Sequence, residues 1–391
     1  MRFPEFHGEW EEHGLSEYLD FKNGLNPDSK RFGKGIKFIS VMDILNNPVI
    51  TYDCIRASVQ ATDAEMSSFS VEYGDILFQR SSETLEDVGR ANVYIDDKVA
   101  VFGGFVIRGK KKANYNPLFF RYLLSSPYAR KRIIPMGAGA QHFNIGQEGL
   151  SKVLLNFPSI EEQTKIASLL HLLDERIATQ SKLIEDLKKL KSAIIDYAIN
   201  SLDTDFAKFS SLYEMAGEGG TPTTSNASFY DNGKIPFVKI DDLKKKYLTE
   251  NKDFITELGL QKSSAWLVPT RSILFSNGAT IGEITITTYP VCTKQGILGI
   301  VPKPNIDVEF LYYFMSSSYF RKAVSRIVTE GTMKTAYLKD INNIRCPIPK
   351  KEKQLDIAKM PSALNFKIDF EQSILKLFGS QKQYLLRQMF M

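Results

Sequence analysis

Basic side chains that recur in both halves of the chain are the residues best suited to chemistry. Lysine and arginine bind phosphate groups, and such contacts position a protein on a nucleic acid without reading its sequence. One basic cluster alone would indicate an ordinary solvated surface. Here clusters stand at related places in both halves, at residues 108–112, 130–132, 244–246 and 321–322. The residues that we predict as phosphate contacts are Lys110, Lys111, Arg130, Lys131, Arg321 and Lys322.

Polar runs also recur in pairs. The runs 79–82 and 276–280 each follow a β-like segment, and the runs 141–144 and 331–334 form a second pair. Amide, hydroxyl and basic side chains in such loops offer the donors and acceptors that base edges require. His142 taken alone would indicate a surface or capping histidine. The base contacts predicted from these runs are Arg80, Ser81, Ser82, Gln141, His142, Asn277, Thr280, Thr332 and Lys334.

Catalytic motifs are not found in the sequence. It contains no GxxxxGK[ST] phosphate loop and no GxSxG nucleophile turn. The segment 116–119 comes within one residue of the Asn-Pro-Pro-Phe motif of amino-methyltransferases, but the matching segment 307–310 does not keep it, and no glycine-rich cofactor loop precedes it. The three cysteines and four histidines lack the spacing of a disulfide framework or a metal site. We predict a binding protein with no catalytic, cofactor-binding or metal-binding residues.

The bulk composition is that of an ordinary globular protein. Of the 391 residues, 43% are hydrophobic and 24% charged, which predicts two or three folded domains rather than disorder. The net charge of +5 is compatible with a nucleic-acid partner but is weak evidence alone. The first residues contain no apolar signal segment, and no apolar run has the length of a membrane span. We therefore expect a cytoplasmic location.

One segment of the chain occurs twice, and this repeat sets the domain organisation. Residues 158–167 return as residues 349–358, an offset of 191 residues. Ser159 followed by Glu162 is a capping box, so the first copy predicts the start of a helix. A repeat of half the chain indicates the duplication of one domain-plus-helix unit, with the two copies related by a pseudo-twofold axis.

Apolar residues follow each copy at alternating steps of four and three, which is the pattern of a coiled-coil seam. Polar residues interrupt both seams at equivalent places, namely Gln180 with Glu371 and Lys191 with Lys382. We therefore expect an antiparallel pair of helices, each roughly 60 Å long at 1.5 Å per residue. Because proline lacks an N–H, Pro361 predicts a short turn over 352–359 and a long helix only from about 361. The predicted seam residues are Ile166, Leu170, Leu173, Ile177, Ile184, Leu187, Ile194, Leu364, Ile368, Leu375, Phe378 and Leu385.

Short β-like runs and helical segments precede each long helix, so the fold class that we predict is α+β. Matching anchors, among them 116–126 with 307–317, show that the two globular units share one framework. The loops between the anchors differ in length, which suits two related domains with different ligands. We place a first domain at 1–157, a spacer helix at 158–200, a second domain at 201–349 and a second spacer helix at 350–391.

In these features the sequence resembles the specificity (S) subunits of type I restriction–modification systems. The resemblance covers essentially the whole chain, and its most specific element is the repeated Pro-x-x-x-Glu-Gln-x-x-Ile-Ala motif. In the second copy the Glu-Gln pair becomes Lys353-Gln354. The segments that carry the resemblance are Arg2–Trp10, Gly220–Pro222 with Phe229–Phe237, Gly331-Thr332, and the motif residues Pro158, Glu162, Gln163, Ile166 and Ala167.

The resemblance implies a division of labour. Each globular unit would be a target recognition domain that reads one half of a bipartite double-stranded DNA sequence, and the paired helices would fix the unread gap. The helices would also dock two methyltransferase (M) subunits, and the full complex would recruit restriction (R) subunits. Methyl transfer and cleavage would then belong to those partners, with S-adenosylmethionine bound by the M subunit.

Three other readings remain open. The chain could serve an orphan or phase-variable system that only methylates DNA. It could be a structural adaptor that binds protein through two modules on a coiled coil. It could also be a methyltransferase or nuclease in its own right, although the missing motifs speak against this.

Overall fold

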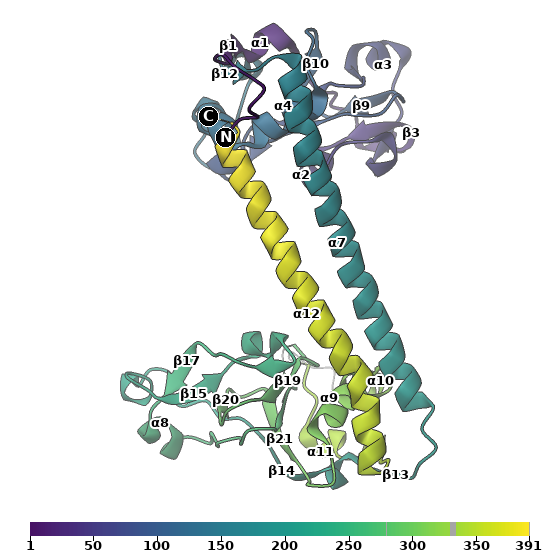
Figure 1. Cartoon of the computed structure of the whole chain (residues 1–391), viewed down its shortest axis with the longest axis vertical. Coiled ribbons are helices and arrows are strands. Elements are labelled where there is room, and N and C mark those ends of the chain that lie inside the picture. The colour runs from purple at the N-terminus through teal and green to yellow at the C-terminus, as the bar shows by residue number, and fades with distance from the viewer. Residues whose placement is uncertain (279, 329–333, 391) are drawn as a thin grey trace. The chain divides into compact units, whose positions relative to one another are not determined.

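Two long helices dominate the computed structural model, α7 (Ile160–Asn200) and α12 (Lys351–Gln388) (Figure 1). The structure describes residues 1–278, 280–328 and 334–390. The chain forms two compact units: unit 1 comprises residues 1–181 and 373–391, and unit 2 comprises residues 182–372. Each unit therefore contains one globular module and one section of each long helix. No helix in the described residues is long and apolar enough to cross a membrane.

Unit 1 is a mixed α and β structure. Its main sheet has the strand order β2-β10-β6-β8, a second sheet has the order β4-β3-β9-β5, and the pairs β1-β12 and β7-β11 stand beside them. The strands are β1 (Glu11–Gly14), β2 (Leu19–Asn23), β3 (Phe32–Ile39), β4 (Ser58–Val59), β5 (Ser70–Val71), β6 (Ile76–Gln79), β7 (Ser81–Ser82), β8 (Ala91–Val93), β9 (Ala100–Phe102), β10 (Val106–Lys111), β11 (Phe143–Asn144) and β12 (Leu154–Phe157). The short helices are α1 (Leu15–Tyr18), α2 (Val41–Asn46), α3 (Asp63–Phe69), α4 (Pro117–Ser125), α5 (Pro127–Ile133) and α6 (Gln147–Ser151).

Unit 2 repeats this plan with its own loops. Its main sheet has the order β14-β21-β18-β19-β16, with a three-stranded sheet β17-β15-β20 and the pair β13-β22. The strands are β13 (Phe206–Lys208), β14 (Tyr213–Glu218), β15 (Ile235–Val238), β16 (Tyr247–Leu248), β17 (Asp253–Ile255), β18 (Ile273–Ser276), β19 (Ile284–Thr287), β20 (Cys292–Thr293), β21 (Ile297–Pro302) and β22 (Arg345–Pro347). The short helices are α8 (Glu257–Gln261), α9 (Val308–Ser316), α10 (Ser318–Ile327) and α11 (Leu338–Ile341).

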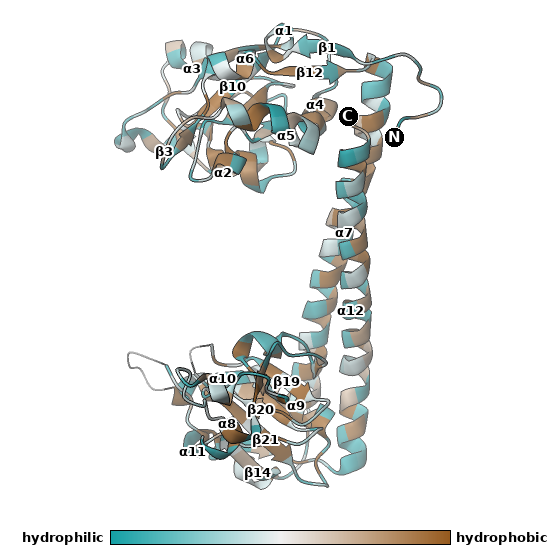
Figure 2. Cartoon of the chain, turned by 90° about the vertical axis from the view of Figure 1, so that its left-hand side faces the viewer, coloured by the Kyte–Doolittle hydropathy of each residue, from teal (hydrophilic) through white to brown (hydrophobic). Residues whose placement is uncertain are grey.

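The largest apolar core of each unit includes residues of both long helices. In unit 1, Leu170 of α7 and Leu386 of α12 belong to the core of the module. In unit 2, Ile195 and Ile199 of α7 and Ile357 of α12 do the same. Figure 2 shows hydrophobic residues concentrated on the strands of the modules and alternating with hydrophilic ones along the long helices. Burial of these side chains therefore stabilises each helix section on its module.

The predicted seam residues all lie in buried or half-buried positions. Ile166, Leu170, Leu173, Ile184, Ile368 and Leu385 are buried, whereas Ile177, Leu187, Ile194, Leu364, Leu375 and Phe378 are half-buried. One polar interruption of the seam bridges the helices in each unit. Lys382 lies 2.5 Å from Asp174 in unit 1, and Lys191 donates to the Asn365 side chain at 3.0 Å in unit 2.

The predicted break at Pro361 was wrong. Helix α12 begins at Lys351 and includes Pro361. Contacts with the module hold this turn in place: Pro361 is buried, and the Ser362 hydroxyl bonds with Lys246 at 2.9 Å and with Tyr313 at 3.1 Å. Local propensity favoured a break, but packing against the rest of unit 2 outweighs the missing hydrogen bond.

A buried glutamine fastens the start of each long helix to its module. In unit 1, Gln163 donates to the Pro158 carbonyl at 3.0 Å and accepts from the Asn116 N–H at 3.0 Å. In unit 2, Gln354 donates to the Pro349 carbonyl at 2.8 Å and accepts from the N–H of Asp307 at 2.7 Å. We call each of these arrangements a glutamine bridge.

The glutamine bridges also reach the neighbouring short helices. Asn116 and Asp307 cap α4 and α9 by accepting from Phe119 and Phe310, both at 3.0 Å. One residue therefore joins the long helix to a capped helix of the module in each unit.

The glutamate of the first motif and the lysine of the second motif lie in different surroundings. Glu162 is buried in unit 1 and bonds with the Arg2 guanidinium at 2.6 and 2.8 Å, which raises the pKa of Arg2. Lys353, at the equivalent place in unit 2, is exposed. Glu162 therefore has an N-terminal partner in unit 1, whereas the glutamine at the next position of the motif has the same role in both copies.

We predict that Gln163→Leu destabilises unit 1 by about 3 kcal/mol, because it leaves the half-buried N–H of Asn116 and the buried carbonyl of Pro158 without partners. Hydrogen exchange measured by mass spectrometry should rise at the start of α4 and α7 and remain unchanged in unit 2. Gln354→Leu should show the converse, and the exposed Gln381→Ala serves as control. Unchanged exchange around Asn116 would contradict the structural role of the bridge.

Candidate DNA-recognition surfaces

Two of the predicted polar runs meet in unit 1. The strands β7 and β11 pair, with Phe143 opposite Ser82 and Asn144 opposite Ser81. The N–H of Ile145 donates to the Arg80 carbonyl at 3.0 Å. The runs 79–82 and 141–144 are far apart in the sequence but lie side by side in the fold.

A third segment joins them, the turn between β9 and β10. The Arg80 N–H donates to the Phe105 carbonyl at 2.9 Å, and the Arg80 guanidinium donates to the Gly104 carbonyl at 3.2 Å. We call residues 80–82, 103–105 and 141–144 the recognition edge of unit 1. Gln141 and His142 lie exposed on it, and the Ser81 hydroxyl bonds with the Asn144 side chain.

Unit 2 builds the same edge with the same backbone bonds. The Asn277 N–H donates to the Gly296 carbonyl at 3.0 Å, and the Ala336 N–H donates to the Asn277 carbonyl at 2.9 Å. These bonds match those at Arg80, so the recognition edge of unit 2 comprises residues 277–280, 294–296 and 334–336, of which 279 is not described. Thr280 and Lys334 are exposed on it, whereas Thr332 lies outside the described residues.

Two predicted base contacts have structural roles instead. Asn277 is 1% exposed, and its amide donates to the Ala336 carbonyl at 3.3 Å. Ser82 is also buried, and its hydroxyl accepts from the Thr84 N–H at 3.2 Å. Both side chains hold loops together. The Asn277 Oδ1 atom has no hydrogen-bond partner among the described residues, but both side chains are buried and neither is presented to a ligand, which corrects the prediction.

Arg130 is a third correction. Its guanidinium donates to three backbone carbonyls, those of Glu86, Val88 and Gly89, at 2.8, 2.6 and 3.0 Å. Burial, followed by the nearby charge of Arg90, lowers the pKa of Arg130 to about 10. The side chain stays charged at neutral pH, but both of its terminal nitrogens are bound to the 86–89 loop, which does not support the predicted phosphate contact.

The other basic candidates differ in how free they are. Lys110 pairs with Glu72 at 3.2 Å, and Lys111 donates to the Tyr115 carbonyl at 3.1 Å, with its pKa lowered by burial. Lys131 of α5 and the pair Arg321 and Lys322 of α10 are exposed. The side chains of these last three make no hydrogen bond or ion pair within the described part of the chain, so they remain available for phosphates.

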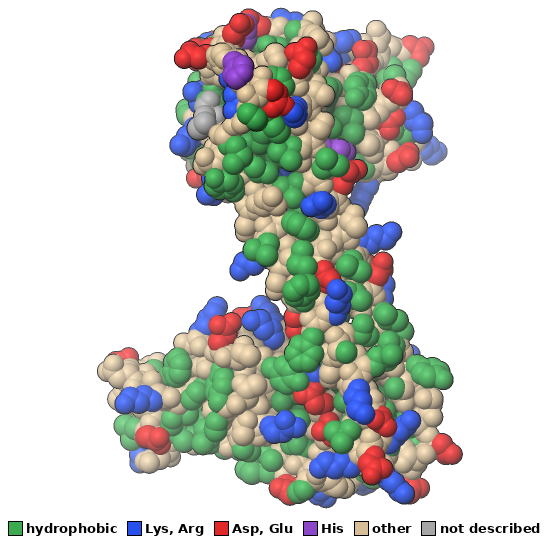
Figure 3. Space-filling view, in the orientation of Figure 1, with side chains coloured by type: hydrophobic (Ala, Val, Ile, Leu, Met, Phe, Trp, Pro, Cys, Tyr) green, Lys and Arg blue, Asp and Glu red, His purple; other side chains and the backbone are tan. Residues whose placement is uncertain are grey.

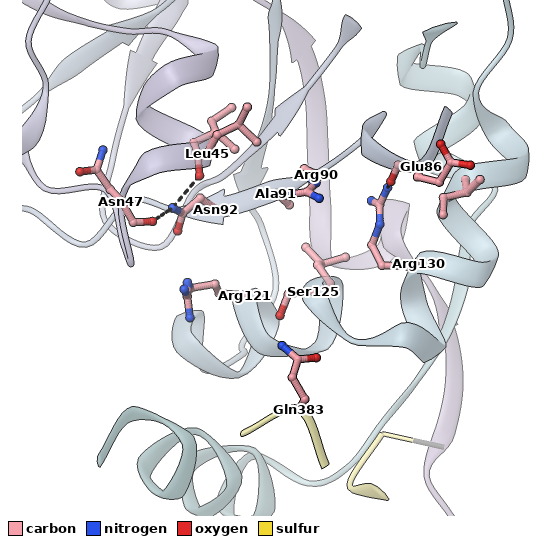
Figure 4. Close-up of a pocket in the computed structure, with 13 residues that line it drawn as sticks. Leu45, Asn47, Glu86, Arg90, Ala91, Asn92, Arg121, Ser125, Arg130 and Gln383 are labelled. Carbon is pink, nitrogen blue, oxygen red and sulfur yellow. Dashed lines mark hydrogen bonds between the residues drawn. The ribbon is translucent and has the colours of Figure 1, made fainter. Parts of the chain in front are cut away.

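A pocket of about 420 Å³ in unit 1 has three arginines among its lining residues (Figure 4). Arg90 pairs with Asp87 at 2.6 Å, Arg121 approaches Asp174 at 3.4 Å, and Arg130 is bound to the loop carbonyls. Each guanidinium already has a partner, and the pocket therefore offers little attraction to a further anion.

On the face drawn in Figure 3, basic and acidic side chains are interspersed over both units.

The basic run at residues 30–37 was not among the contacts predicted from the sequence. Arg31 is neutralised by Glu65, to which it donates at 3.0 Å, and Lys37 donates to the Ile55 carbonyl at 2.6 Å. Lys30 and Lys34 are exposed and make no side-chain bond with any residue that the structure describes. The alternation of basic residues with Gly33 and Gly35 was the signal available in the sequence.

No group of three or more His, Cys, Asp or Glu side chains in the described ranges has the arrangement of a metal site.

The model of the type I restriction modification DNA specificity domain matches this chain twice, over residues 7–189 and 204–377. The chain belongs to this family. The two matches also show that the domain occurs as two copies, in agreement with the repeated motif and with the two modules of the fold.

Relatives and solved structures of specificity subunits agree with the family match. The HindI specificity subunit of Haemophilus influenzae is 22% identical over 83% of this chain and 86% of its own length. The MjaVIII specificity subunit of Methanocaldococcus jannaschii is 21% identical over 94% and 90%. The crystal structure of an S subunit from M. genitalium has a TM-score of 0.58 at 15% identity and covers 100% of this chain and 99% of that one. At such identity the structural likeness shows a shared fold.

We predict that Arg130→Ala lowers the free energy of unfolding of unit 1 by about 2 kcal/mol, because two half-buried carbonyls and one exposed carbonyl lose their donor. Arg321→Ala, the equivalent and exposed position in unit 2, should change stability by less than about 0.5 kcal/mol. Denaturant unfolding of the two variants compares them directly. Equal effects would show that Arg130 does not hold the 86–89 loop.

Proposed function

We propose that this chain is the DNA-specificity component of a type I restriction–modification complex, in which each module reads one half of a bipartite target. One observation carries the proposal: both units build a recognition edge with the same backbone hydrogen bonds but different side chains. Arg80 and Phe105 in unit 1 correspond to Asn277 and Gly296 in unit 2. A constant frame with variable groups suits two readers of two different sequences.

We further propose that α7 and α12 form one antiparallel coiled coil with a pseudo-twofold axis. Asp174 and Asn365 are 191 residues apart, as are Lys191 and Lys382, so the two interhelical bonds are equivalent under the repeat. The beginning of α7 packs with the end of α12 in unit 1, and the end of α7 packs with the beginning of α12 in unit 2. These contacts support an antiparallel arrangement.

In this proposal the coiled coil is the ruler for the unread gap between half-sites. Helix α7 has 41 residues, which corresponds to about 60 Å at 1.5 Å per residue. The recognition domains would then be residues 1–157 and 201–349, and the spacer helices residues 158–200 and 350–391.

Partner subunits carry the chemistry in this proposal. Two M subunits transfer the methyl group, R subunits join in the full complex, and the chain itself is not a catalyst. Exposed apolar side chains on the long helices support docking of this kind, because groups of exposed apolar side chains on a protein surface mark sites of protein–protein contact. They recur at heptad spacing: Leu183, Leu190 and Tyr197 on α7, and Phe370, Leu377 and Tyr384 on α12. The complex would act in the cytoplasm.

We predict that co-expression with the M subunit encoded beside this chain produces adenine methylation at one bipartite motif. Single-molecule sequencing of the cellular DNA identifies the motif, and deletion of the gene should abolish it. Binding of the purified complex to duplex DNA should weaken steeply with salt, since phosphate contacts release counterions. A complex that forms but yields no motif would contradict a specificity role. A chain that forms no complex and ignores DNA would favour the adaptor reading.

A further inference from the structure

Phe105 of unit 1 is held in solvent by a rigid turn. The residue is 67% exposed. A Cβ atom added at Gly104 would lie 1.8 Å from the Asn26 Oδ1 atom, and one at Gly103 would lie 2.6 Å from the Phe38 ring. The turn is thus pressed against its neighbours, and the bond from the Arg80 N–H fixes the Phe105 carbonyl. An apolar ring so firmly presented is suited to contact with a ligand.

A hollow of about 380 Å³ lies beside this turn, and its walls are mostly apolar. Phe32 and Phe38 stand edge to face with their ring centres 5.2 Å apart. Phe32 is 43% exposed and Met42 is 60% exposed. Together with Phe105 they form an apolar platform next to the recognition edge.

Positively charged side chains accompany the apolar platform. Two lysines are its neighbours in the sequence, and one arginine lies on the recognition edge. Lys30 and Lys34 flank Phe32, and both are exposed without a partner in the described residues. Arg80 uses one guanidinium nitrogen on the Gly104 carbonyl. A partner that is apolar at its centre and anionic at its border fits this surface. Duplex DNA meets both conditions, since the thymine methyl group is the apolar feature of the major groove and the phosphates border it.

The equivalent turn of unit 2 has the opposite character. The matching backbone bond ends on Gly296 instead of Phe105, and Lys294 and Gln295 beside it are exposed. A glutamine amide at this place can pair with the N6 and N7 atoms of adenine, but it offers no apolar surface for a methyl group. The two modules therefore differ at one equivalent position of their recognition edges.

We propose that Phe105, with Phe32 and Met42, contacts the methyl group of a thymine in the half-site read by unit 1, while Lys30 and Lys34 bind the adjacent phosphates. The proposal rests on the proposed function and adds a specificity-determining residue to it. Phe105 reads an A·T pair, and the lysines contribute affinity without sequence preference.

The first test determines the methylation motif of the wild-type complex and of three variants by single-molecule sequencing. Phe105→Ala should relax one A·T position in one half-site and leave the other half-site unchanged. Lys30→Ala combined with Lys34→Ala should lower methylation at all sites without changing the motif. Tyr73→Ala, an exposed aromatic of unit 1 outside the hollow, is the matched control.

The second test removes the methyl group from the DNA instead of the ring from the protein. Replacing the relevant thymine by deoxyuridine should weaken binding of the wild-type complex about fourfold, the value expected for one buried methyl group. The same replacement should have no effect on DNA binding by the Phe105→Ala complex. Because the test measures binding, it can be interpreted even if that variant methylates poorly.

The outcomes separate the two proposals. If the wild-type chain gives no bipartite motif, the proposed function fails, and this inference fails with it. If a motif appears but neither half-site specifies an A·T pair that depends on Phe105, only the inference is overturned. Equal sensitivity of both complexes to deoxyuridine would also overturn it.

Discussion

The buried glutamine at the start of each long helix is the constraint on which the rest of the structure depends. Gln163 and Gln354 each use both ends of one amide, so the helix and the capped short helix beside it cannot move independently without leaving a buried polar group unpaired. Each long helix therefore leaves its module in a defined direction. The apolar cores around the helix sections and the bonds Lys382–Asp174 and Lys191–Asn365 build on this start.

A fixed frame frees the loops to vary. The recognition edges of the two units keep their backbone bonds while the side chains at equivalent places differ in size, polarity and charge. Because the frame carries the stability, a change such as Phe105 to Gly296 costs the fold little and changes what the edge can bind. This separation explains how one duplicated domain can serve two different half-sites.

Much of this organisation was predictable from the sequence, and the reasons for the failures are physical. The repeated motif and the apolar spacing gave the two helices and the buried or half-buried seam, because periodicity survives in a linear pattern. The break expected at Pro361 did not occur, because contacts of Ser362 with Lys246 and Tyr313 outweigh local propensity.

The binding residues were harder to predict. Arg130 and Asn277 carry the right chemistry for DNA, but only the fold shows that the Arg130 guanidinium donates to backbone carbonyls and that the Asn277 side chain is buried. Phe105 was not predicted as a contact because exposure of an apolar residue has no sequence signature.

The most direct test of the central claim replaces residues 206–348 with a second copy of residues 11–157 and determines the methylation motif. The account predicts a palindromic motif with the unit 1 half-site on both sides of the gap. An unchanged asymmetric motif would contradict the claim that each module reads its own half-site on a common twofold frame.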